Sequence, residues 1–229
     1  GGDAYGRFYD ASGNPTGNEF RIDDMSAGRD RGVKPVALSD GTFLVVWQWT
    51  PDGAPYDGEI RHYARRYGAD GEALDAASFE VAAGLQDVSL GYQALALSDG
   101  GFLIAVTAVD AASGARRAYF ERRDADGAKV GETYAAVPKA NSGEDQGVPL
   151  LVALSDGGFL AVWGSTDADG PGSFARRFDA DGQARGAVFR VLSTAEVEAD
   201  LGQTVESAGV AEVTELADGR LVVGYQIQY

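Results

Sequence analysis

The chain has 229 residues, no cysteine and a formal net charge of −16, and these numbers exclude several classes of protein. Without cysteine it has no disulfides, thiolate metal sites or thiol nucleophiles. The negative charge repels phosphate backbones and anionic lipid, so neither nucleic acid nor a membrane is an expected partner. The longest apolar run, residues 102–109, is far shorter than the roughly 18 residues of a spanning helix. The 32 glycines are about twice the usual share of roughly 7% and predict many turns.

The first motif along the chain is a short run of arginine and aromatic residues that leads into a glycine-containing turn. A second apolar stretch follows each copy, some seven to ten residues later. Aromatic and β-branched stretches bounded by turn residues are typical of strands, so each copy predicts a β-hairpin. The motif occurs four times, beginning at Arg7, Arg65, Arg122 and Arg176.

A second motif alternates with the first and consists of Leu-Ser-Asp-Gly, or Leu-Ala-Asp-Gly in the last copy, followed by an apolar run. An Asp-Gly pair supplies the positive φ that a short hairpin turn requires, so we interpret these aspartates as turn residues. The irregular spacing of 59, 57 and 62 residues indicates loops of variable length around a constant core. The aspartates are Asp40, Asp99, Asp156 and Asp218.

The apolar runs after the first three of these turns, residues 43–47, 102–106 and 159–163, are apolar on both faces. Such strands must be covered on both sides. Two hairpins per repeat give four strands, and radial repetition of four-stranded sheets leaves only short edges. The sequence therefore predicts an all-β fold, a four-bladed β-propeller built from four repeats of four antiparallel strands. A β-sandwich or a barrel is the alternative.

The two ends of the chain predict how this propeller closes. The chain begins with the second hairpin of a repeat, residues 5–22, and ends with the first hairpin of another, residues 213–227. We expect these N- and C-terminal half-units to share one sheet. The prediction is a single repeat domain, 1–229, whose units are 1–22 plus 205–229, 23–84, 85–140 and 141–204.

The motifs also resemble a known family. Residues 177–182 followed by 189–191, and residues 153–163, are similar to repeats of roughly 55 residues in large secreted bacterial proteins that often carry haemolysin-type (RTX) calcium-binding arrays. The resemblance implies a secreted or cell-surface bacterial protein with a modular, non-enzymatic role. It carries no catalytic residue over, and the glycine-rich calcium-binding nonapeptide of those arrays is absent here.

Asp-x-Asp-Gly occurs three times and is the candidate for a metal site, because calcium prefers oxygen-rich loops. The copies at residues 124–127 and 179–182 fall on a repeated hairpin turn, which explains them without a metal. The third copy lies in a variable loop, where the repeat does not require it. We therefore predict Asp167 and Asp169 as metal ligands and calcium as the cofactor, with a simple turn as the alternative.

Arg66, Arg122 and Arg177 occupy one strand position of the repeat. In so acidic a chain they are expected to pair with carboxylates at neighbouring turns. The functional alternative is a ligand carboxylate or sulfate.

The loop from 48 to 59 departs most from the repeat and supplies the candidate ligand-binding residues Trp49, Asp52 and Tyr56. Flat aromatic faces suit sugars, and binding residues concentrate on loops held by a rigid scaffold. The alternative is a loop packed on its own blade. Three aromatic residues at one repeated strand position are instead expected in the core: Trp47, Trp163 and Tyr225.

Evidence for catalysis is weak in the sequence. The only histidine, His62, lies in a strand-like segment and is interpreted as a surface or strand residue, and no Gly-x-Ser-x-Gly elbow is present. The prediction is a protein that is not an enzyme, an extracellular or cell-surface binding or structural module for a glycan or a surface protein, with self-association also considered. The alternatives are a calcium-dependent lectin and, in another class, a glycoside hydrolase or other hydrolase.

Overall fold

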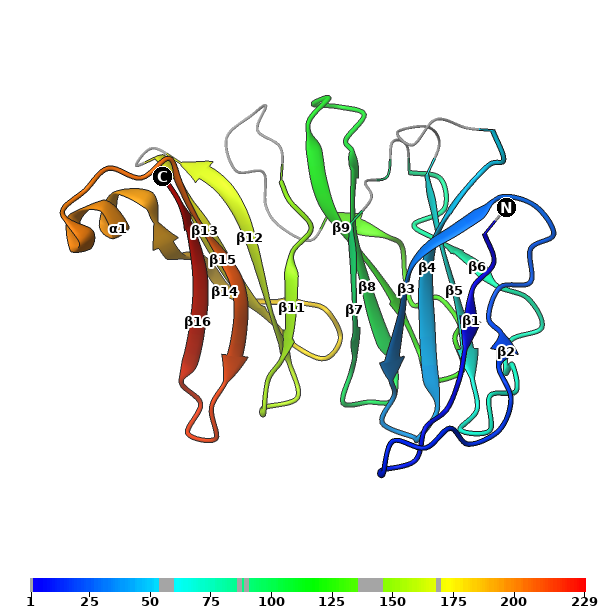
Figure 1. Ribbon diagram of the computed structural model, residues 1–229. Coiled ribbons are helices and arrows are strands. Elements are labelled where there is room, and N and C mark those ends of the chain that lie inside the picture. Colours follow the sequence, from blue (N-terminus) through cyan, green and yellow to red (C-terminus); the bar gives the residue numbers. More distant parts are fainter. Residues whose placement is uncertain (1, 54–59, 86–87, 89–90, 136–145, 168–169) are drawn as a thin grey trace. The chain divides into compact units, whose positions relative to one another are not determined.

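The computed structural model describes residues 2–53, 60–85, 88, 91–135, 146–167 and 170–229. The chain divides into two compact units, Gly1–Leu90 and Gly91–Tyr229. The strands pair in antiparallel sheets throughout the described ranges, and one short helix accompanies them (Figure 1). No helix in these ranges is long and apolar enough to cross a membrane.

The first unit holds a two-stranded sheet followed by a four-stranded sheet, in which neighbouring strands pair in chain order. The small sheet is the hairpin β1–β2 near the N-terminus. The larger sheet begins with an irregularity in the register between β3 and β4 and continues regularly to β5. The strands are β1 (Tyr5–Gly6), β2 (Phe20–Arg21), β3 (Arg29–Ala37), β4 (Phe43–Thr50), β5 (Arg61–Tyr67) and β6 (Phe79–Val81).

The second unit holds two four-stranded sheets, β7 to β10 and β11 to β14, and the separate hairpin β15–β16. Its helix α1 (Thr194–Leu201) joins β14 to β15. The strands are β7 (Tyr92–Ala96), β8 (Phe102–Val109), β9 (Arg116–Arg123), β10 (Tyr134–Ala135), β11 (Leu150–Ala153), β12 (Phe159–Asp167), β13 (Gly170–Phe178), β14 (Ala184–Ser193), β15 (Ser207–Glu215) and β16 (Leu221–Gln228).

The repeated Asp-Gly turns have the same hydrogen bonds in all four copies, which confirms the turn prediction. In each, the aspartate Oδ1 accepts from the backbone N–H two residues later, at 2.9 Å for Asp40 and 3.1 Å for Asp218. The following glycine has a positive φ, for example 86° at Gly41, which other residues adopt at a cost. Local chemistry alone therefore shapes these turns.

The core of the first unit is largely aromatic. Trp47 is fully buried and Tyr67 is 1% exposed, and both lie in a cluster that also includes Ile22 from the segment after β2. Phe43 stacks on Tyr67 with ring centroids 5.3 Å apart, and Phe20 of the N-terminal hairpin contacts both rings. Burial of these rings attaches β1–β2 to the four-stranded sheet of its own unit.

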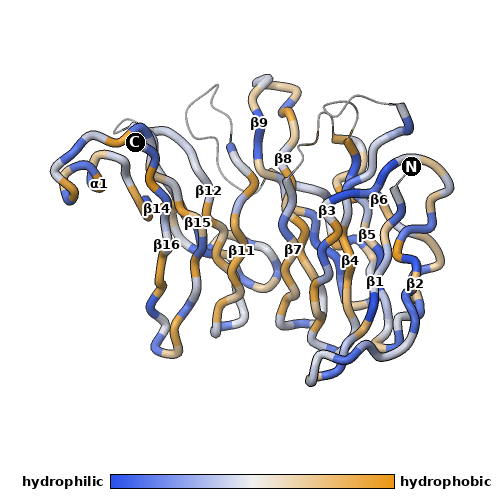
Figure 2. The backbone as a smooth tube through the Cα atoms, in the orientation of Figure 1, coloured by the Kyte–Doolittle hydropathy of each residue, from blue (hydrophilic) through white to orange (hydrophobic). Residues whose placement is uncertain are grey.

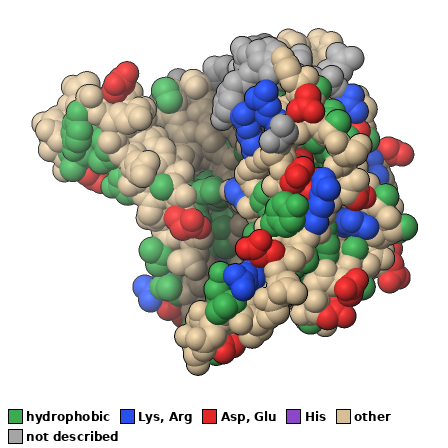
Figure 3. All heavy atoms as spheres, turned by 45° about the vertical axis from the view of Figure 1, so that its right-hand side comes forward, with side chains coloured by type: hydrophobic (Ala, Val, Ile, Leu, Met, Phe, Trp, Pro, Cys, Tyr) green, Lys and Arg blue, Asp and Glu red, His purple; other side chains and the backbone are tan. Residues whose placement is uncertain are grey.

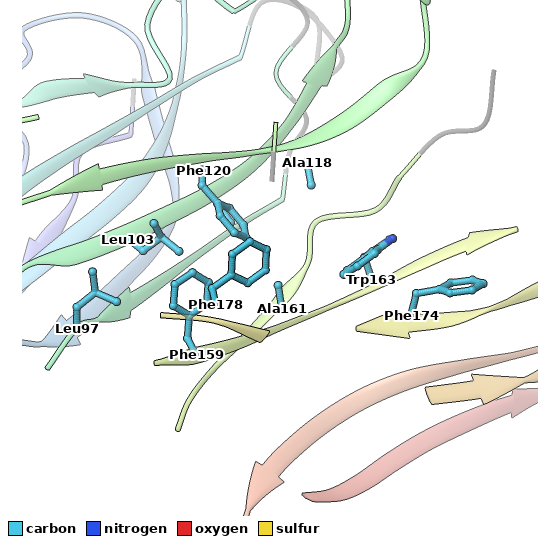
Figure 4. Close-up of a cluster of buried hydrophobic side chains, with 10 residues drawn as sticks. Leu97, Leu103, Ala118, Phe120, Phe159, Ala161, Trp163, Phe174 and Phe178 are labelled. Carbon is cyan, nitrogen blue, oxygen red and sulfur yellow. The ribbon is translucent and has the colours of Figure 1, made fainter. Parts of the chain in front are cut away.

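The core of the second unit lies between its two four-stranded sheets. Phe120 of β9, Phe159 of β12 and Phe178 of β13 point toward one another (Figure 4), and the last two rings stack at 5.0 Å. All seven residues 102–108 of β8 are buried, as the two-faced apolar run predicted. The tube in Figure 2 shows this apolar character along β4 and β8.

The all-β prediction with four-stranded antiparallel sheets is confirmed. Within the first unit β1 pairs with β2, and within the second unit β15 pairs with β16. The predicted closure between these two half-units stays a prediction. Each hairpin buries its inner face within its own unit: β15 contacts β11, β12, β13 and β14, as Phe20 contacts Phe43 in the first unit. Packing within its own unit therefore holds each hairpin.

Two further differences concern the second unit. The prediction that three repeated aromatic residues lie in the core is confirmed for Trp47 and for Trp163, which is 4% exposed. It is wrong for Tyr225, which is 47% exposed. Tyr225 lies on β16, which pairs with one strand, β15, in the part of the chain that the structure describes. The helix α1 was not expected: the Ser193 hydroxyl accepts from the N–H of Glu196 at 3.1 Å and Gly202 ends the helix at φ 67°, signals that are visible in the sequence but short.

Candidate functional site

The predicted ligand-binding residues lie at one end of the sheet of the first unit. Trp49 is a half-buried residue of β4, and its indole Nε1–H donates to the carbonyl of Ala27 at 2.8 Å. The carboxylate of Asp52 accepts from the N–H of Gly28 at 3.1 Å. Both side chains therefore hold the segment before β3, and Tyr56 lies outside the described residues.

The predicted calcium site remains a prediction. Asp167 is the last residue of β12 and pairs with Gly170, and Asp169 lies outside the described residues. In the other two copies of the motif, Asp124 and Asp179 accept from backbone N–H groups of their own turns at 2.9 and 2.8 Å. The described ranges contain no group of three or more His, Asp or Glu side chains arranged to hold a metal ion.

The expected pairing of the repeated arginines with carboxylates is confirmed at two positions. Arg66 donates to Asp75 through Nη2 at 2.7 Å and through Nε at 3.1 Å. Arg122, 8% exposed, pairs with the turn aspartate Asp99 and also donates to the carbonyl of Ala180. Positive and negative side chains accordingly lie side by side on the face shown in Figure 3.

A cluster of three carboxylates and one arginine, which sequence reasoning missed, lies beside Trp49. Asp3 precedes β1, Arg21 ends β2, Asp23 follows β2, and Asp30 is the second residue of β3. Asp30 is directly opposite Trp49 in the register between β3 and β4. We call these four residues, Asp3, Arg21, Asp23 and Asp30, the acidic cluster. Thirty-five acidic residues made every pairing ambiguous in the sequence, and only the fold brings these three together.

Arg21 holds two of the carboxylates in the acidic cluster. Its Nε and Nη2 donate to the two oxygens of Asp23 at 2.9 and 2.7 Å, and Nη2 also lies 3.3 Å from Asp3 Oδ1. The N–H of Ala4 donates to Asp23 at 3.3 Å. The side chain of Asp23 is 1% exposed, whereas that of Asp3 is 51% exposed. One buried and one accessible carboxylate therefore share an arginine.

The two inner carboxyl groups have opposite pKa shifts. Burial alone would raise the pKa of Asp23, but hydrogen bonds from Arg21 and the Ala4 N–H outweigh it and hold the pKa below its ordinary value. Burial raises the pKa of Asp30 to about 7, and the charge of Asp23, a hydrogen bond to Asp23 and the charge of Asp3 act in the same direction. The Asp30 Oδ1 atom is buried and has no hydrogen-bond partner among the described residues.

The carboxyl groups of the acidic cluster are suited to general acid and base catalysis. A carboxyl group that keeps its proton near neutral pH can donate that proton while a second, ionised carboxylate accepts one. Hydrolysis of a glycosidic bond uses such a pair. His62 does not supply an alternative base at the surface: it is a fully buried residue of β5, opposite Gln48 and Val81.

Comparisons with known proteins find a similar fold but assign the chain to no family. No family model and no curated protein matches the sequence. The structure is similar to the crystal structure of an endo-arabinase from Bacteroides thetaiotaomicron VPI-5482, with a TM-score of 0.50 and 15% identity over 93% of this chain and 76% of that chain. A protein of unknown function from Dyadobacter fermentans DSM 18053 has a TM-score of 0.44 and 13% identity, over 90% of this chain and 64% of that one.

The first likeness supports an all-β, propeller-like fold and corrects the main functional expectation. A non-enzymatic binding or structural module was predicted, but the structure that shares this fold over most of the chain is that of an endo-arabinase.

Proposed function

We propose that the protein is a glycoside hydrolase and that the acidic cluster is its active site. One observation carries the proposal: Asp30, whose pKa burial raises to about 7, lies beside the carboxyl groups of Asp23 and Asp3. The likeness to an endo-arabinase supports it at the level of the fold, and makes arabinose-containing polysaccharides the first substrates to test. An enzyme that cleaves polysaccharide also agrees with the secreted location implied by the family resemblance.

Each residue of the cluster has a distinct role in this reaction. Asp30 donates its proton to the oxygen of the departing sugar, and the bond between that oxygen and the anomeric carbon breaks. Asp3, half exposed and held by Arg21, accepts the proton of the attacking water. Asp23 is buried and is a positioning residue, because its charge raises the pKa of Asp30. The half-buried ring of Trp49, opposite Asp30, offers a face for a sugar.

The test is a hydrolysis assay with the full chain against a panel of polysaccharides that includes arabinan. Asp30→Asn should lower kcat by about 10²-fold or more, since general acid catalysis typically contributes 10²–10⁴-fold. The matched control is Asp126→Asn, an exposed aspartate outside the cluster. Activity should also fall as pH rises through about 7, when Asp30 loses its proton. No activity on the whole panel, or full activity in Asp30→Asn, would refute the proposal.

A further inference from the structure

A row of polar and aromatic side chains crosses the sheet of the first unit next to the acidic cluster. Asp30 of β3 lies opposite Trp49 of β4, and Trp49 lies opposite Arg61 of β5. Residues directly opposite each other in an antiparallel pair point to the same face of the sheet. The three side chains therefore share one face, with the indole ring between the other two. Neighbouring strands are about 5 Å apart, so Arg61 is roughly 10 Å across the sheet from Asp30.

The fourth strand of the sheet adds a carboxylate to this row. Tyr63 lies two residues after Arg61 and opposite Glu80 of β6, so Glu80 is on the same face. Arg61 Nη1 and Glu80 Oε2 are 3.5 Å apart, and the two side chains are 42% and 33% exposed. An ion pair with this exposure contributes little to stability. Both groups are accessible to a ligand that lies on the ring of Trp49.

The ring of Trp49 is held in a fixed position. Its Nε1–H donates to the carbonyl of Ala27, and a Cβ atom on Gly28 would overlap Nε1, so this close approach requires the glycine, whose φ is 102°. The ring of Tyr63 lies at 84° to that of Trp49, with centroids 6.2 Å apart. Trp49 is nevertheless only half-buried. A ring that is already ordered loses little conformational freedom when a ligand binds.

The repeat does not require an aromatic residue at the position of Trp49. The equivalent positions in the second unit, two residues after Val106 and Trp163, are Ala108 and Ser165. Ala108 is fully buried. A residue that served only the sheet would be expected in every copy. The accessible ring therefore indicates a role that belongs to this sheet alone, and its neighbour there is the acidic cluster.

We propose that Trp49, Arg61 and Glu80 form a binding subsite for an uncharged sugar, adjacent to the bond that the acidic cluster cleaves. The position relative to that bond rests on the proposed function. The ring of Trp49 stacks on the C–H face of the sugar, while Arg61 donates to its hydroxyl groups and Glu80 accepts from them. An aromatic surface with a few convergent polar groups is usual at sites for small molecules.

The charges around the subsite favour an uncharged sugar over a uronic acid. Arg61 is paired with Glu80, and Arg21 is paired with Asp23 and Asp3. Both arginines therefore already have carboxylate partners. The chain as a whole carries a charge of −16, which repels an anionic ligand.

Binding of oligosaccharides to the full chain tests the subsite without relying on hydrolysis. The probes are neutral arabino- and xylo-oligosaccharides, and oligomers of galacturonic acid are the charged comparison. Titration calorimetry is carried out with Asp30→Asn in the chain, so that a probe is not consumed. At least one neutral probe should bind. The galacturonic acid oligomer should bind at least several-fold more weakly, and added salt should reduce this difference.

Variants in the same background identify the residues that bind. Trp49→Ala should weaken binding several-fold, because it removes the stacking surface. Trp49→Phe keeps an aromatic face without the bond to Ala27 and should retain most of the affinity. Arg61→Met keeps the length of the side chain without its donors and should also weaken binding several-fold. The control is Arg220→Met, at an exposed arginine that pairs with Asp218 in the second unit, and it should bind normally.

Several outcomes overturn the proposal. They are normal binding by both Trp49→Ala and Arg61→Met, an equal loss in Trp49→Phe and Trp49→Ala, and no binding of any neutral probe. Equal binding of neutral and charged probes overturns the choice of an uncharged sugar. If Trp49→Ala lowers the melting temperature strongly, Trp49→Phe and Arg61→Met carry the test. Binding that depends on Trp49 and Arg61, without hydrolysis by the unmodified chain, would refute the proposed function and leave a sugar-binding site.

Discussion

Trp163 and Tyr225 occupy the same position of the repeat in the same compact unit, yet Trp163 is 4% exposed and Tyr225 is 47% exposed. The strand of Trp163, β12, has β11 on one side and β13 on the other, and Trp163 belongs to the cluster that includes Phe120 of the neighbouring sheet. Among the described residues, the strand of Tyr225, β16, pairs with β15 alone.

The difference shows that the repeat motif does not by itself bury an aromatic side chain. The two strands follow turns with the same hydrogen bonds, at 3.0 Å for Asp156 and 3.1 Å for Asp218, so their local structure is equivalent. Burial is added by the neighbouring strands and by the next sheet. A complete sheet is therefore the unit that makes a core, and a hairpin alone leaves half of its surface exposed.

The largest expected effect is the difference in stability between a variant that lacks the ring of Trp163 and one that lacks the ring of Tyr225. Trp163→Ala should lower the free energy of unfolding by about 3–5 kcal/mol, because it leaves a cavity in a packed cluster. Tyr225→Ala at low protein concentration should cost about 1 kcal/mol or less, as is usual for a partly exposed residue. Urea denaturation monitored by circular dichroism measures both values. Equal losses would show that Tyr225 is buried in solution by a contact that the isolated chain lacks.

The second expected effect is a dependence of stability on pH that arises at the N-terminal hairpin and not at the C-terminal one. The N-terminal hairpin is tied to β3 by the acidic cluster, whereas the C-terminal hairpin is held by apolar residues such as Val213 and Val223. Because the pKa of Asp30 rises from 3.8 to about 7 on folding, the folded state keeps a proton that the unfolded chain has lost. This contribution to stability is complete below about pH 4 and is lost as pH rises through about 7.

Melting temperatures between pH 5 and 8 measure this effect, in a range where Asp23 stays ionised. The melting temperature should fall over this range in the unmodified chain and much less in Asp30→Asn. Asp126→Asn, which changes an exposed carboxylate outside the cluster, should retain the full pH dependence. An unchanged slope in Asp30→Asn would mean that Asp30 titrates normally.

The smallest expected effect concerns the turns, where the complete sheet and the hairpin should behave alike. Asp156→Ala and Asp218→Ala each remove one carboxylate-to-backbone hydrogen bond and one exposed ion pair, to Arg185 and Arg220 respectively. Each should cost about 1 kcal/mol. Denaturation curves of the two variants should therefore agree within about 0.5 kcal/mol. A clearly larger loss for Asp156 would show that the turn contributes to packing as well as to local geometry.

The sequence was sufficient for everything that depends on residues close together in the chain. The Asp-Gly turns, the strands that follow them and the four-stranded antiparallel repeat were predicted from short motifs, because positive φ at glycine and two-faced apolar runs are local requirements. The pairing of Arg66 with Asp75 also follows from their closeness, nine residues apart across one hairpin.

Contacts between distant segments were decided only by the tertiary structure. The sequence gives no reason to choose Asp3, Asp23 and Asp30 among 35 acidic residues, and their opposite pKa shifts arise from burial and from Arg21, which depend on how β1, β2 and β3 pack. The exposure of Tyr225 has the same origin. Its turn and its strand follow the repeat, but burial depends on the strands that pack beside it in the folded unit.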